Sequence, residues 1–473
     1  MAATDTFHAS LFDAAPDPAP DLDPGFRPWA LGARRFRAAL TASPRREPVV
    51  LGLAQGDRPV ARLELEVFPE GAGRDRENLR YVTAHLDGLL WARGGSRVRV
   101  AAPPRLREAL LASFGPDGDW AFERELLGRA YDEPLAAEAA QAGDIPPEAP
   151  CGSILGGHLD GCRIGFDLGA SDYKVAAVMD GREVFSAELP WEPKGAADPA
   201  YHVERIDAGL RLAAAHLPRV DAIGGSSAGI LVGNRVKVAS LFRGVPEAVF
   251  RTRVEPLFLR LGRAWGVPFE VINDGDVTAL AGGLSLGVRG LLGIALGSSE
   301  AAGYLDREGR ITGWLNELAF GSVDAAPGAA ADDWSGDPGA GAACFSQQAV
   351  DRLAAAAGLP FEPGLDLPGR LREAQVRLGA GDPRALRLFR TIGHWLGHTL
   401  PWYAAFYPLD HVLILGRVTS GDAGPVILEA ARAALARTDP ALAGTLALHL
   451  PDEKSRRVGQ AVAAASLPRL AGG

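Results

Sequence analysis

Two repeating patterns of apolar residues predict the elements of the first third of the chain. Residues 60–68 alternate apolar and polar side chains, which is typical of a strand with one buried and one exposed face. Residues 49–53 and 97–101 also have strand patterns, whereas residues 78–91 and 105–114 have helical spacing. This part of the chain is therefore expected to form an α/β unit.

A longer α/β pattern begins near residue 160. An apolar strand enters a glycine turn after Phe166, and a second strand follows over residues 175–179. Two later strands, 221–224 and 267–272, each end in small or polar residues, and residues 384–406 have the spacing of a long helix. Polar residues at strand ends are typical of binding sites in α/β proteins.

These patterns divide the chain into four parts. Residues 1–25 are rich in Ala, Asp and Pro and are expected to be a disordered or loosely draped tail. Residues 26–150 are predicted to form an N-terminal α/β domain that ends in a linker. Residues 151–290 and 291–473 are predicted to form two further lobes, with a C-terminal helix that returns to the first of them.

The N-terminal domain has the same hairpin, helix and strand order as the pattern that begins at residue 163. It is either a degenerate copy of that unit or an unrelated small α/β domain, and the sequence leaves both open. Ala54 stands where a copy would need Asp167. A degenerate copy is therefore not expected to bind nucleotide.

Composition excludes several classes of protein. The 473 residues carry a formal net charge of −9, which argues against a nucleic-acid partner. The chain shows neither a secretory leader nor an apolar run long enough to cross a membrane, so no membrane association is expected. Its three cysteines give no disulfide or metal-type spacing. A cytoplasmic location is expected.

The turn after Phe166 also has a chemical interpretation. Small residues between paired strands allow backbone N–H groups to surround an anion, and the carboxylate of Asp167 can hold a hydrated cation. A glycine-containing β-hairpin is the alternative interpretation of the same residues. The downstream segments decide between the two.

Six segments follow one another in a recognisable order. They are GFDLGASD, IGGSSAGILVGNRV, VINDGDVTALAGG, LGSSEAAGY, WLNELAF and LILGRV. From residue 160 to the C-terminus this order resembles the ROK family of sugar kinases and repressors. The resemblance implies an actin/hexokinase-like (RNase H-like) α/β fold of two lobes that closes on a sugar, with ATP and Mg²⁺ as cofactors.

The resemblance also implies roles for single residues. Asp274 matches the general base that takes a proton from the attacked sugar hydroxyl, and Asp167 would hold Mg²⁺ through water. The implied sugar-binding residues are Gly225, Asn273 and Glu317. The implied nucleotide-binding residues are Asp167, Gly169, Ser171, Gly297, Ser298 and Gly416.

Several positions depart from the family pattern. Glu300 interrupts the glycine-rich second phosphate loop, where a carboxylate would repel a triphosphate unless it points away. Phe320 replaces a histidine of the sugar pocket, and only Cys344 remains of a zinc motif whose last glutamate is Ser346. No zinc site is therefore predicted. Arg417 replaces a glycine near adenosine, and Lys174 has no counterpart in the family.

Three functions are compatible with these residues. The first is ATP-dependent phosphoryl transfer to a hydroxyl of a sugar or sugar-like small molecule. The second is a sugar- or nucleotide-binding sensor with reduced catalysis on the same scaffold, which Glu300 and the lost sugar contacts favour. A DNA-binding repressor is third, because residues 26–150 show strands where a winged helix needs consecutive helices. The sequence leaves a homodimer open.

Overall fold

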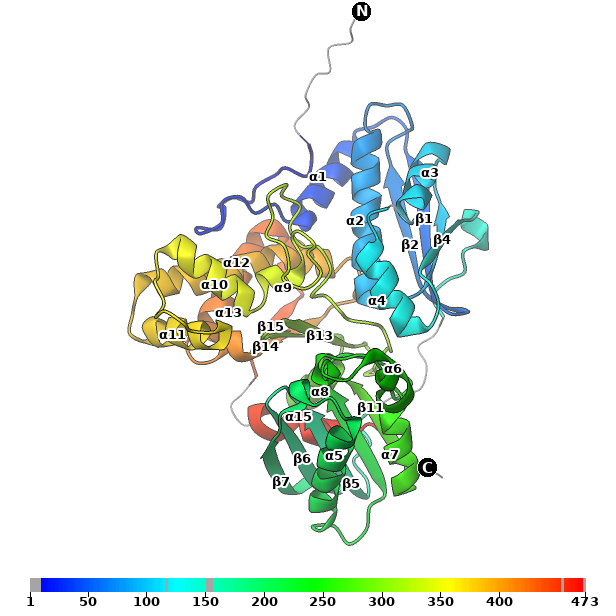
Figure 1. The fold of residues 1–473 in the computed structure, drawn as a ribbon. Helices are drawn as coiled ribbons and strands as arrows, with labels where there is room; N and C mark the ends of the chain where they lie inside the picture. Colours follow the sequence, from blue (N-terminus) through cyan, green and yellow to red (C-terminus); the bar gives the residue numbers. More distant parts are fainter. Residues whose placement is uncertain (1–9, 116–117, 150–155, 452–454, 471–473) are drawn as a thin grey trace, which may run out of the picture.

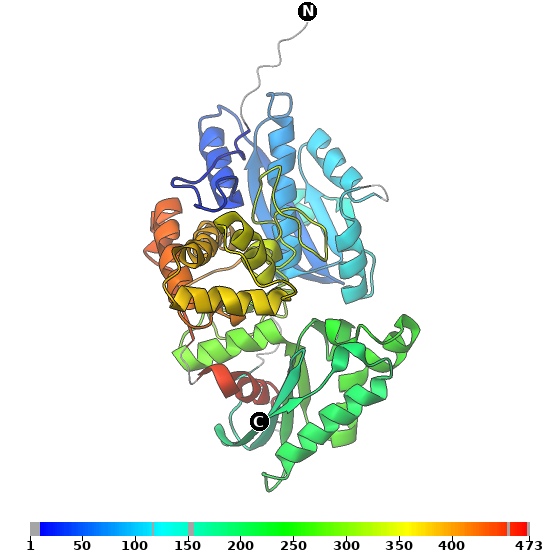
Figure 2. The ribbon, with the colours of Figure 1, turned by 60° about the vertical axis from the view of Figure 1, so that its left-hand side comes forward.

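The computed structural model describes residues 10–115, 118–149, 156–451 and 455–470. The N-terminal domain and the second lobe (residues 291–451) lie beside each other, and the first lobe (residues 156–290) lies at the opposite end of the molecule (Figures 1 and 2). The N-terminal domain also meets the first lobe directly, since Arg129 pairs with Glu247 at 3.1 Å and Asp132 pairs with Lys237 at 2.5 Å. None of the helices in the described residues is long and apolar enough to cross a membrane.

The N-terminal domain is a four-stranded sheet, ordered β2-β1-β3-β4, with helices packed on it. Its elements are α1 (Trp29–Thr41), β1 (Glu47–Gln55), β2 (Arg58–Val67), α2 (Asp75–Arg93), β3 (Arg97–Ala101), α3 (Pro104–Ser113), α4 (Ala121–Tyr131) and β4 (Ala136–Ala139). Strand β4 and the buried Ile145 lie in the segment that the sequence pattern suggested was a linker.

The first lobe is a five-stranded sheet, ordered β11-β8-β5-β6-β7. Its elements are β5 (Cys162–Leu168), β6 (Asp172–Met179), β7 (Arg182–Pro190), α5 (Pro199–Ala214), β8 (Ala222–Ser227), β9 (Ile230–Val232), β10 (Arg235–Val238), α6 (Glu247–Val249), α7 (Leu257–Trp265), β11 (Phe269–Asn273) and α8 (Asp274–Leu286). Strands β5, β6 and β7 are antiparallel, and β8 and β11 continue the sheet parallel to β5.

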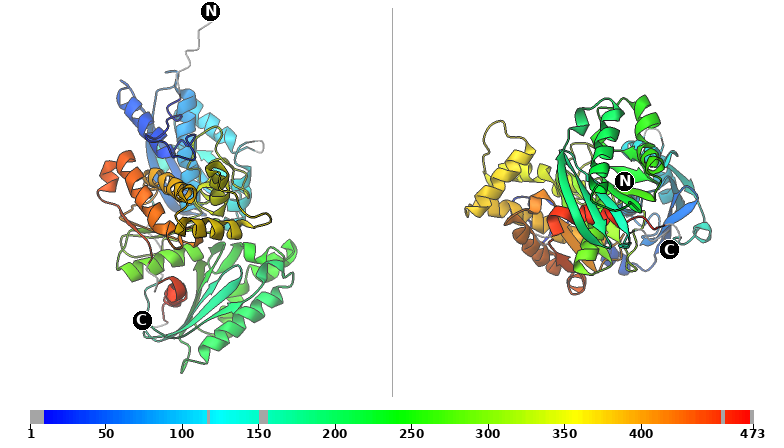
Figure 3. Two further views of the ribbon diagram at one scale, coloured as in Figure 1. Left: turned by 90° about the vertical axis from the view of Figure 1, so that its left-hand side faces the viewer. Right: turned by 90° about the horizontal axis from the view of Figure 1, so that it is seen from below.

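The second lobe is a four-stranded sheet, ordered β13-β12-β14-β15, with a helical layer beside it. Its elements are β12 (Leu291–Leu296), β13 (Glu300–Leu305), α9 (Gly341–Cys344), α10 (Gln347–Ala357), α11 (Leu367–Gly379), α12 (Pro383–Tyr403), β14 (His411–Leu415), α13 (Ala423–Thr438), α14 (Pro440–Ala443) and β15 (Ala447–His449). Helix α15 (Ser455–Ala465) then crosses back and packs on the first lobe's sheet (Figure 3).

The pairing of β3 shows that the N-terminal domain is not a copy of the first lobe. β3 runs antiparallel to β1, with Leu51 opposite Val100, whereas the matching strand β8 runs parallel to β5. In the first lobe a third strand, β7, reverses the chain before the crossover helix. The N-terminal domain enters its helix directly from β2, so β3 arrives in the opposite direction. The interpretation as a degenerate copy was therefore wrong.

The tail prediction was also wrong for residues 10–25, while residues 1–9 lie outside the described part. Phe12 is only 1% exposed and packs against Trp29 and Phe36 with ring centroids 5.4 and 6.0 Å apart. Asp21 pairs with Arg387 of α12 at 2.5 Å. One large aromatic residue and an ion pair anchor a segment whose composition is otherwise typical of disorder.

Hydrophobic packing joins the N-terminal domain to the second lobe more closely than it joins the two lobes. One continuous core contains residues of β1, α2, α12 and β14, whereas the first lobe has a separate core of its own. A smaller cluster around α8 and α15 connects the lobes. The N-terminal domain and the second lobe are therefore expected to move as one body.

Candidate active site

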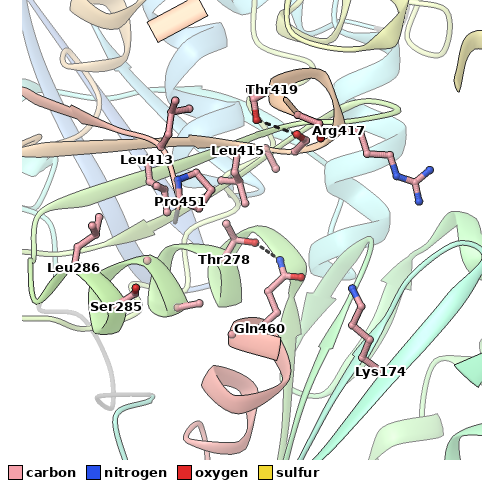
Figure 4. Close-up of a pocket in the computed structure, with 17 residues that line it drawn as sticks. Lys174, Thr278, Ser285, Leu286, Leu413, Leu415, Arg417, Thr419, Pro451 and Gln460 are labelled. Atoms are coloured by element: carbon pink, nitrogen blue, oxygen red, sulfur yellow. Dashed lines mark hydrogen bonds between the residues drawn. The ribbon is translucent and has the colours of Figure 1, made fainter. Parts of the chain in front are cut away.

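Two cavities meet at Ala295, which lines both of them. The larger has a volume of about 500 Å³ and lies between the lobes, over α8 and α15 and under β14 (Figure 4). The smaller, of about 270 Å³, lies where α8 begins and β13 starts. The residues of the smaller cavity used below are Ile230, Val238, Asn273, Asp274, Gly297, Ser298, Glu300, Glu317, Phe320 and Trp334.

The N-terminus of α8 presents Asp274 to the smaller cavity. Asn273 caps the helix, since its Oδ1 accepts the N–H of Gly275 at 2.7 Å and its Nδ2 donates to the carbonyl of Gly229 at 2.8 Å. A Cβ at Gly275 would stand 2.0 Å from the carbonyl oxygen of Ala302. Glycine at this position therefore lets the first turn of α8 pack directly against β13. This packing fixes the position of Asp274 in the cavity wall.

Asp274 and Glu317, two of the three carboxyl groups that line the smaller cavity, have different protonation states. Burial, with a contribution from the charge of Asp167, raises the pKa of Asp274 to about 6. Burial and the nearby charges of Asp274 and Asp276 raise the pKa of Glu317 to about 8. At neutral pH Asp274 is mostly ionised and can accept a proton, whereas Glu317 is mostly protonated and can donate a hydrogen bond.

The N-terminal domain holds the loop that carries Glu317. The N–H groups of residues 315–317 donate to the carbonyls of residues 91–93, at the end of α2, over 3.0–3.1 Å. The guanidinium of Arg93 lies 3.3 Å from the centroid of a Trp314 ring, and its Nη2 donates to the carbonyl of Phe406 at 2.7 Å. The loop is thus fixed between the N-terminal domain and the segment that follows α12.

A buried polar network connects this loop to α8. Asn316 donates from Nδ2 to Oδ1 of Asp276 at 2.8 Å and accepts from the hydroxyl of Tyr407 at 3.0 Å. Burial raises the pKa of Asp276 to about 7. The network ties Glu317 to the helix that begins at Asp274. The family motif did not single out Asp276, although the NDGD segment places it two residues after Asp274.

The side chain of Glu300 points away from the loop between β12 and β13 and into the interior of the second lobe. Its Oε1 accepts a hydrogen bond from the hydroxyl of Tyr403 at 3.1 Å, and burial raises the pKa of its carboxyl to about 8. The nearby charge of Glu317 adds to this increase. Glu300 is therefore mostly protonated at neutral pH and places little negative charge beside Gly297 and Ser298.

Asp167 is buried at the end of β5. Its Oδ1 accepts a hydrogen bond from the hydroxyl of Ser226 at 2.8 Å. Burial raises the pKa of Asp167, while the hydrogen bond from Ser226 and the charge of Lys174 oppose that increase. Because the charge of Asp167 also acts on Asp274, the two carboxylates lie close enough to influence each other across the sheet edge.

Four residues of the predicted site, Asp167, Gly169, Ser171 and Gly225, line neither of these cavities. Gly169 and Ser171 form the tip of the β5–β6 hairpin, where Trp191 donates to the carbonyl of Gly169 at 2.8 Å. Gly225 lies inside β8, and a Cβ there would stand 2.1 Å from the Phe166 ring. Its role in the structure is to admit this ring to the core of the first lobe.

The larger cavity contains Gly416 and two cationic residues. Gly416 ends β14 with a φ of 97°, and a Cβ there would stand 2.4 Å from the carbonyl oxygen of Leu296. Lys174 of β6 extends toward the cavity from the first lobe, and Arg417 lines it from the second (Figure 4). The cavity therefore combines an apolar interior, which includes Leu413 and Leu415, with positive charge from both lobes.

The region of the lost zinc motif is packed as ordinary structure. Within the described residues, no group of three His, Cys, Asp or Glu side chains is arranged to hold a metal ion. Cys344 is buried in α9, and burial raises the pKa of its thiol to about 12. Ser346 caps α10, where its hydroxyl oxygen accepts the N–H of Gln348 at 3.1 Å.

Comparison with known proteins identifies the fold. No protein-family model matches the chain. No curated protein matches it either. Among solved structures, a ROK hexokinase from Thermus thermophilus has 22% sequence identity and a TM-score of 0.50, over 65% of this chain and 97% of that one. A ROK family transcriptional regulator, a homolog of the E. coli MLC protein, has 18% identity and a TM-score of 0.51, over 65% and 79%.

These similarities confirm the predicted actin/hexokinase-like fold. The strand orders of the two lobes, each an antiparallel start continued by parallel strands, agree with it. The chain therefore has the two-lobed fold of the ROK sugar kinases and regulators, with an additional N-terminal α/β domain.

Proposed function

We propose that the chain transfers the γ-phosphoryl group of ATP to a hydroxyl of a sugar or sugar-like small molecule. The fold serves both a hexokinase and a transcriptional regulator, so the choice rests on the site. The observation that carries the proposal is the pair of adjoining cavities, one with a poised carboxylate and one with cationic residues from both lobes.

The smaller cavity receives the acceptor. Asp274 accepts the proton of the attacking hydroxyl while the hydroxyl oxygen forms a bond to the γ-phosphorus and the bond to ADP breaks. Asn273 and Glu317 hold neighbouring hydroxyls of the acceptor, with Glu317 as a neutral donor and acceptor. A base with a pKa of about 6 is well matched to proton transfer near neutral pH.

The larger cavity receives the nucleotide. Its apolar interior suits an adenine ring, and Gly416 lets the chain pass close to β12 at the end of β14. Lys174 and Arg417 supply positive charge for the phosphate groups. The neutral Glu300 removes the repulsion that its position in the second phosphate loop would otherwise cause.

The residues present fit a Mg²⁺ ion. Asp167 uses one carboxylate oxygen to accept from Ser226, which leaves the other for a water of the hydrated ion. The charge of Asp167 raises the pKa of Asp274, and a divalent cation held by Asp167 would offset that charge. When bound, the ion would neutralise charge that develops on the transferred group.

A sensor with reduced catalysis is the second candidate. Two observations favour it: Phe320 stands where the family has a polar sugar ligand, and Ser346 is occupied in capping α10. A sensor would bind both ligands without turnover. The two functions differ in whether ADP forms only when the acceptor is present.

Asp274→Asn tests the proposal. The substitution keeps the volume and most hydrogen bonds but removes the basicity, so ADP release should fall by about 10² or more while acceptor affinity stays nearly unchanged. Turnover would be measured as acceptor-dependent ADP release and binding as thermal stabilisation. Asp57→Asn, whose side chain is 99% exposed in the N-terminal domain, is the matched control. Equal turnover in both variants would contradict the proposal.

A further inference from the structure

Building on the proposed transfer, we infer that the acceptor is a sugar or polyol that carries an aryl or alkyl substituent, which packs against Phe320 and Trp334. The smaller cavity has two chemically different sides. Asn273, Asp274 and Glu317 are polar, whereas Ile230, Val238, Phe320 and Trp334 are apolar. A ligand that fills such a cavity needs hydroxyls at one end and apolar surface at the other.

The apolar side is a built surface. Phe320 is only 4% exposed, and its ring lies 4.9 Å from Trp91, 5.1 Å from Phe122 and 5.2 Å from Trp334 between centroids. Trp91 and Phe122 come from α2 and α4 of the N-terminal domain. Because this packing holds Phe320 in place, the side chain cannot easily turn aside to admit a polar group.

Trp334 is the member of this cluster that still has free surface. It is 60% exposed, while it lines the cavity and meets Phe320 edge to face at 73°. Its backbone is fixed, since the N–H groups of Trp334 and Ser335 donate to Oδ2 of Asp332 at 3.0 and 2.8 Å. An exposed indole, whose side chain has only two rotatable torsions, offers apolar area to a ligand at low cost in conformational entropy.

The polar side leaves few groups to recognise further hydroxyls. Asn273 already uses its amide oxygen and one amide hydrogen within the protein. Glu300, which also lines the cavity, uses Oε1 to accept from Tyr403, and its Oε2 is buried without a hydrogen-bond partner among the described residues. A free hexose would place hydroxyls against Phe320 and leave them without partners, which disfavours binding. An apolar substituent at that end avoids this penalty and buries the ring of Trp334.

The test compares matched ligands and variants. Free glucose, mannose and galactose would be assayed beside their phenyl and cyclohexyl glycosides, by thermal stabilisation and by ADP release with Mg·ATP. We expect the substituted sugars to bind roughly tenfold or more tightly than the free sugars. Trp334→Ala should reduce this ratio to about threefold or less, with unchanged ATP affinity. Phe320→His should shift the preference toward the free sugars.

Val376→Ala, at a residue that is 71% exposed and outside the cavity, is the control and should keep the wild-type ratio. Trp334→Phe should keep most of it, because an aromatic face remains. Equal affinity for free and substituted sugars, or an unchanged ratio in Trp334→Ala, would overturn the inferred ligand class. Tight binding of a phenyl glycoside without ADP release would instead overturn the proposed transfer, while the ligand class would stand.

Discussion

The two cavities share Ala295 but depend on different parts of the chain. Both cavities have walls from both lobes, so lobe movement is expected to change the shape of each. The smaller cavity has one wall fixed to the N-terminal domain through residues 315–317 and Phe320. This difference suggests that the N-terminal domain determines which acceptor is bound, whereas the lobes determine nucleotide binding.

Replacing the cationic residues of the larger cavity is expected to give the largest difference between the effects on ATP affinity and on acceptor affinity. Replacing Lys174 and Arg417 together with alanine should weaken ATP affinity by roughly tenfold to a hundredfold, because both charges near the phosphates are lost. Acceptor affinity should change little. Nucleotide titration calorimetry would measure the first effect, and Arg182→Ala, at an exposed position on β7, is the control. An equal loss of acceptor affinity would contradict the assignment of the two ligands to separate cavities.

Replacing Arg93 is expected to have a smaller effect, and to weaken acceptor binding instead of ATP binding. Removing its guanidinium takes away the contact with Trp314 and the hydrogen bond to Phe406, so the loop that carries Glu317 loosens. Arg93→Ala should raise the KM for the acceptor roughly tenfold, with an unchanged KM for ATP. Arg93→Lys should recover little, because lysine lacks the planar guanidinium.

Steady-state kinetics with each substrate varied in turn would check this prediction. A parallel increase in both KM values would mean that Arg93 supports the whole fold and not the acceptor loop alone.

The smallest effect concerns pH. Burial raises the pKa of Glu123 in α4 to about 8, and the charge of Asp87 in α2 adds to the increase. Because the folded pKa lies above the unfolded value, the folded state binds the extra proton. The stability from Glu123 is fully present below its ordinary pKa of 4.5 and is lost as pH rises through about 8.

Glu123→Gln should therefore flatten the decrease in melting temperature between about pH 5 and 9, by a few degrees. The wild-type KM for the acceptor should rise as pH passes about 8, because Glu317 in the smaller cavity then loses the proton that it donates. Exposed Glu125, also in α4, provides the control Glu125→Gln. A steeper decrease in Glu123→Gln would contradict this account.

Sequence reasoning predicted the lobes because local pattern and motif order specify them. The turn after Asp167, the strand end at Asn273 and the glycine at position 416 each depend on neighbouring residues alone. The family resemblance predicted that Asp274 and Glu317 share one cavity, although 43 positions separate them in the sequence. The remaining features of the site depend on contacts between residues that are far apart in the sequence.

The missed features all depend on packing between distant segments. Residues 91–93 hold residues 315–317 through backbone groups, which leave no mark on side-chain composition. The direction of β3 depends on the number of strands before its helix, and the position of Phe12 depends on a pocket made by α1. Glu300 could be recognised as a departure from the family, but its protonation depends on burial beside Tyr403.

The most direct measurement of the central claim is a single-turnover experiment with ATP labelled in its γ-phosphate. Wild-type protein would be mixed with labelled Mg·ATP and a phenyl glycoside, and the label would be followed with time. The account predicts that the label appears on the glycoside in the wild type, at least about 10² times more slowly in Asp274→Asn, and that both proteins bind both ligands. Label that stays on ATP while both ligands are bound to the wild type would contradict the account.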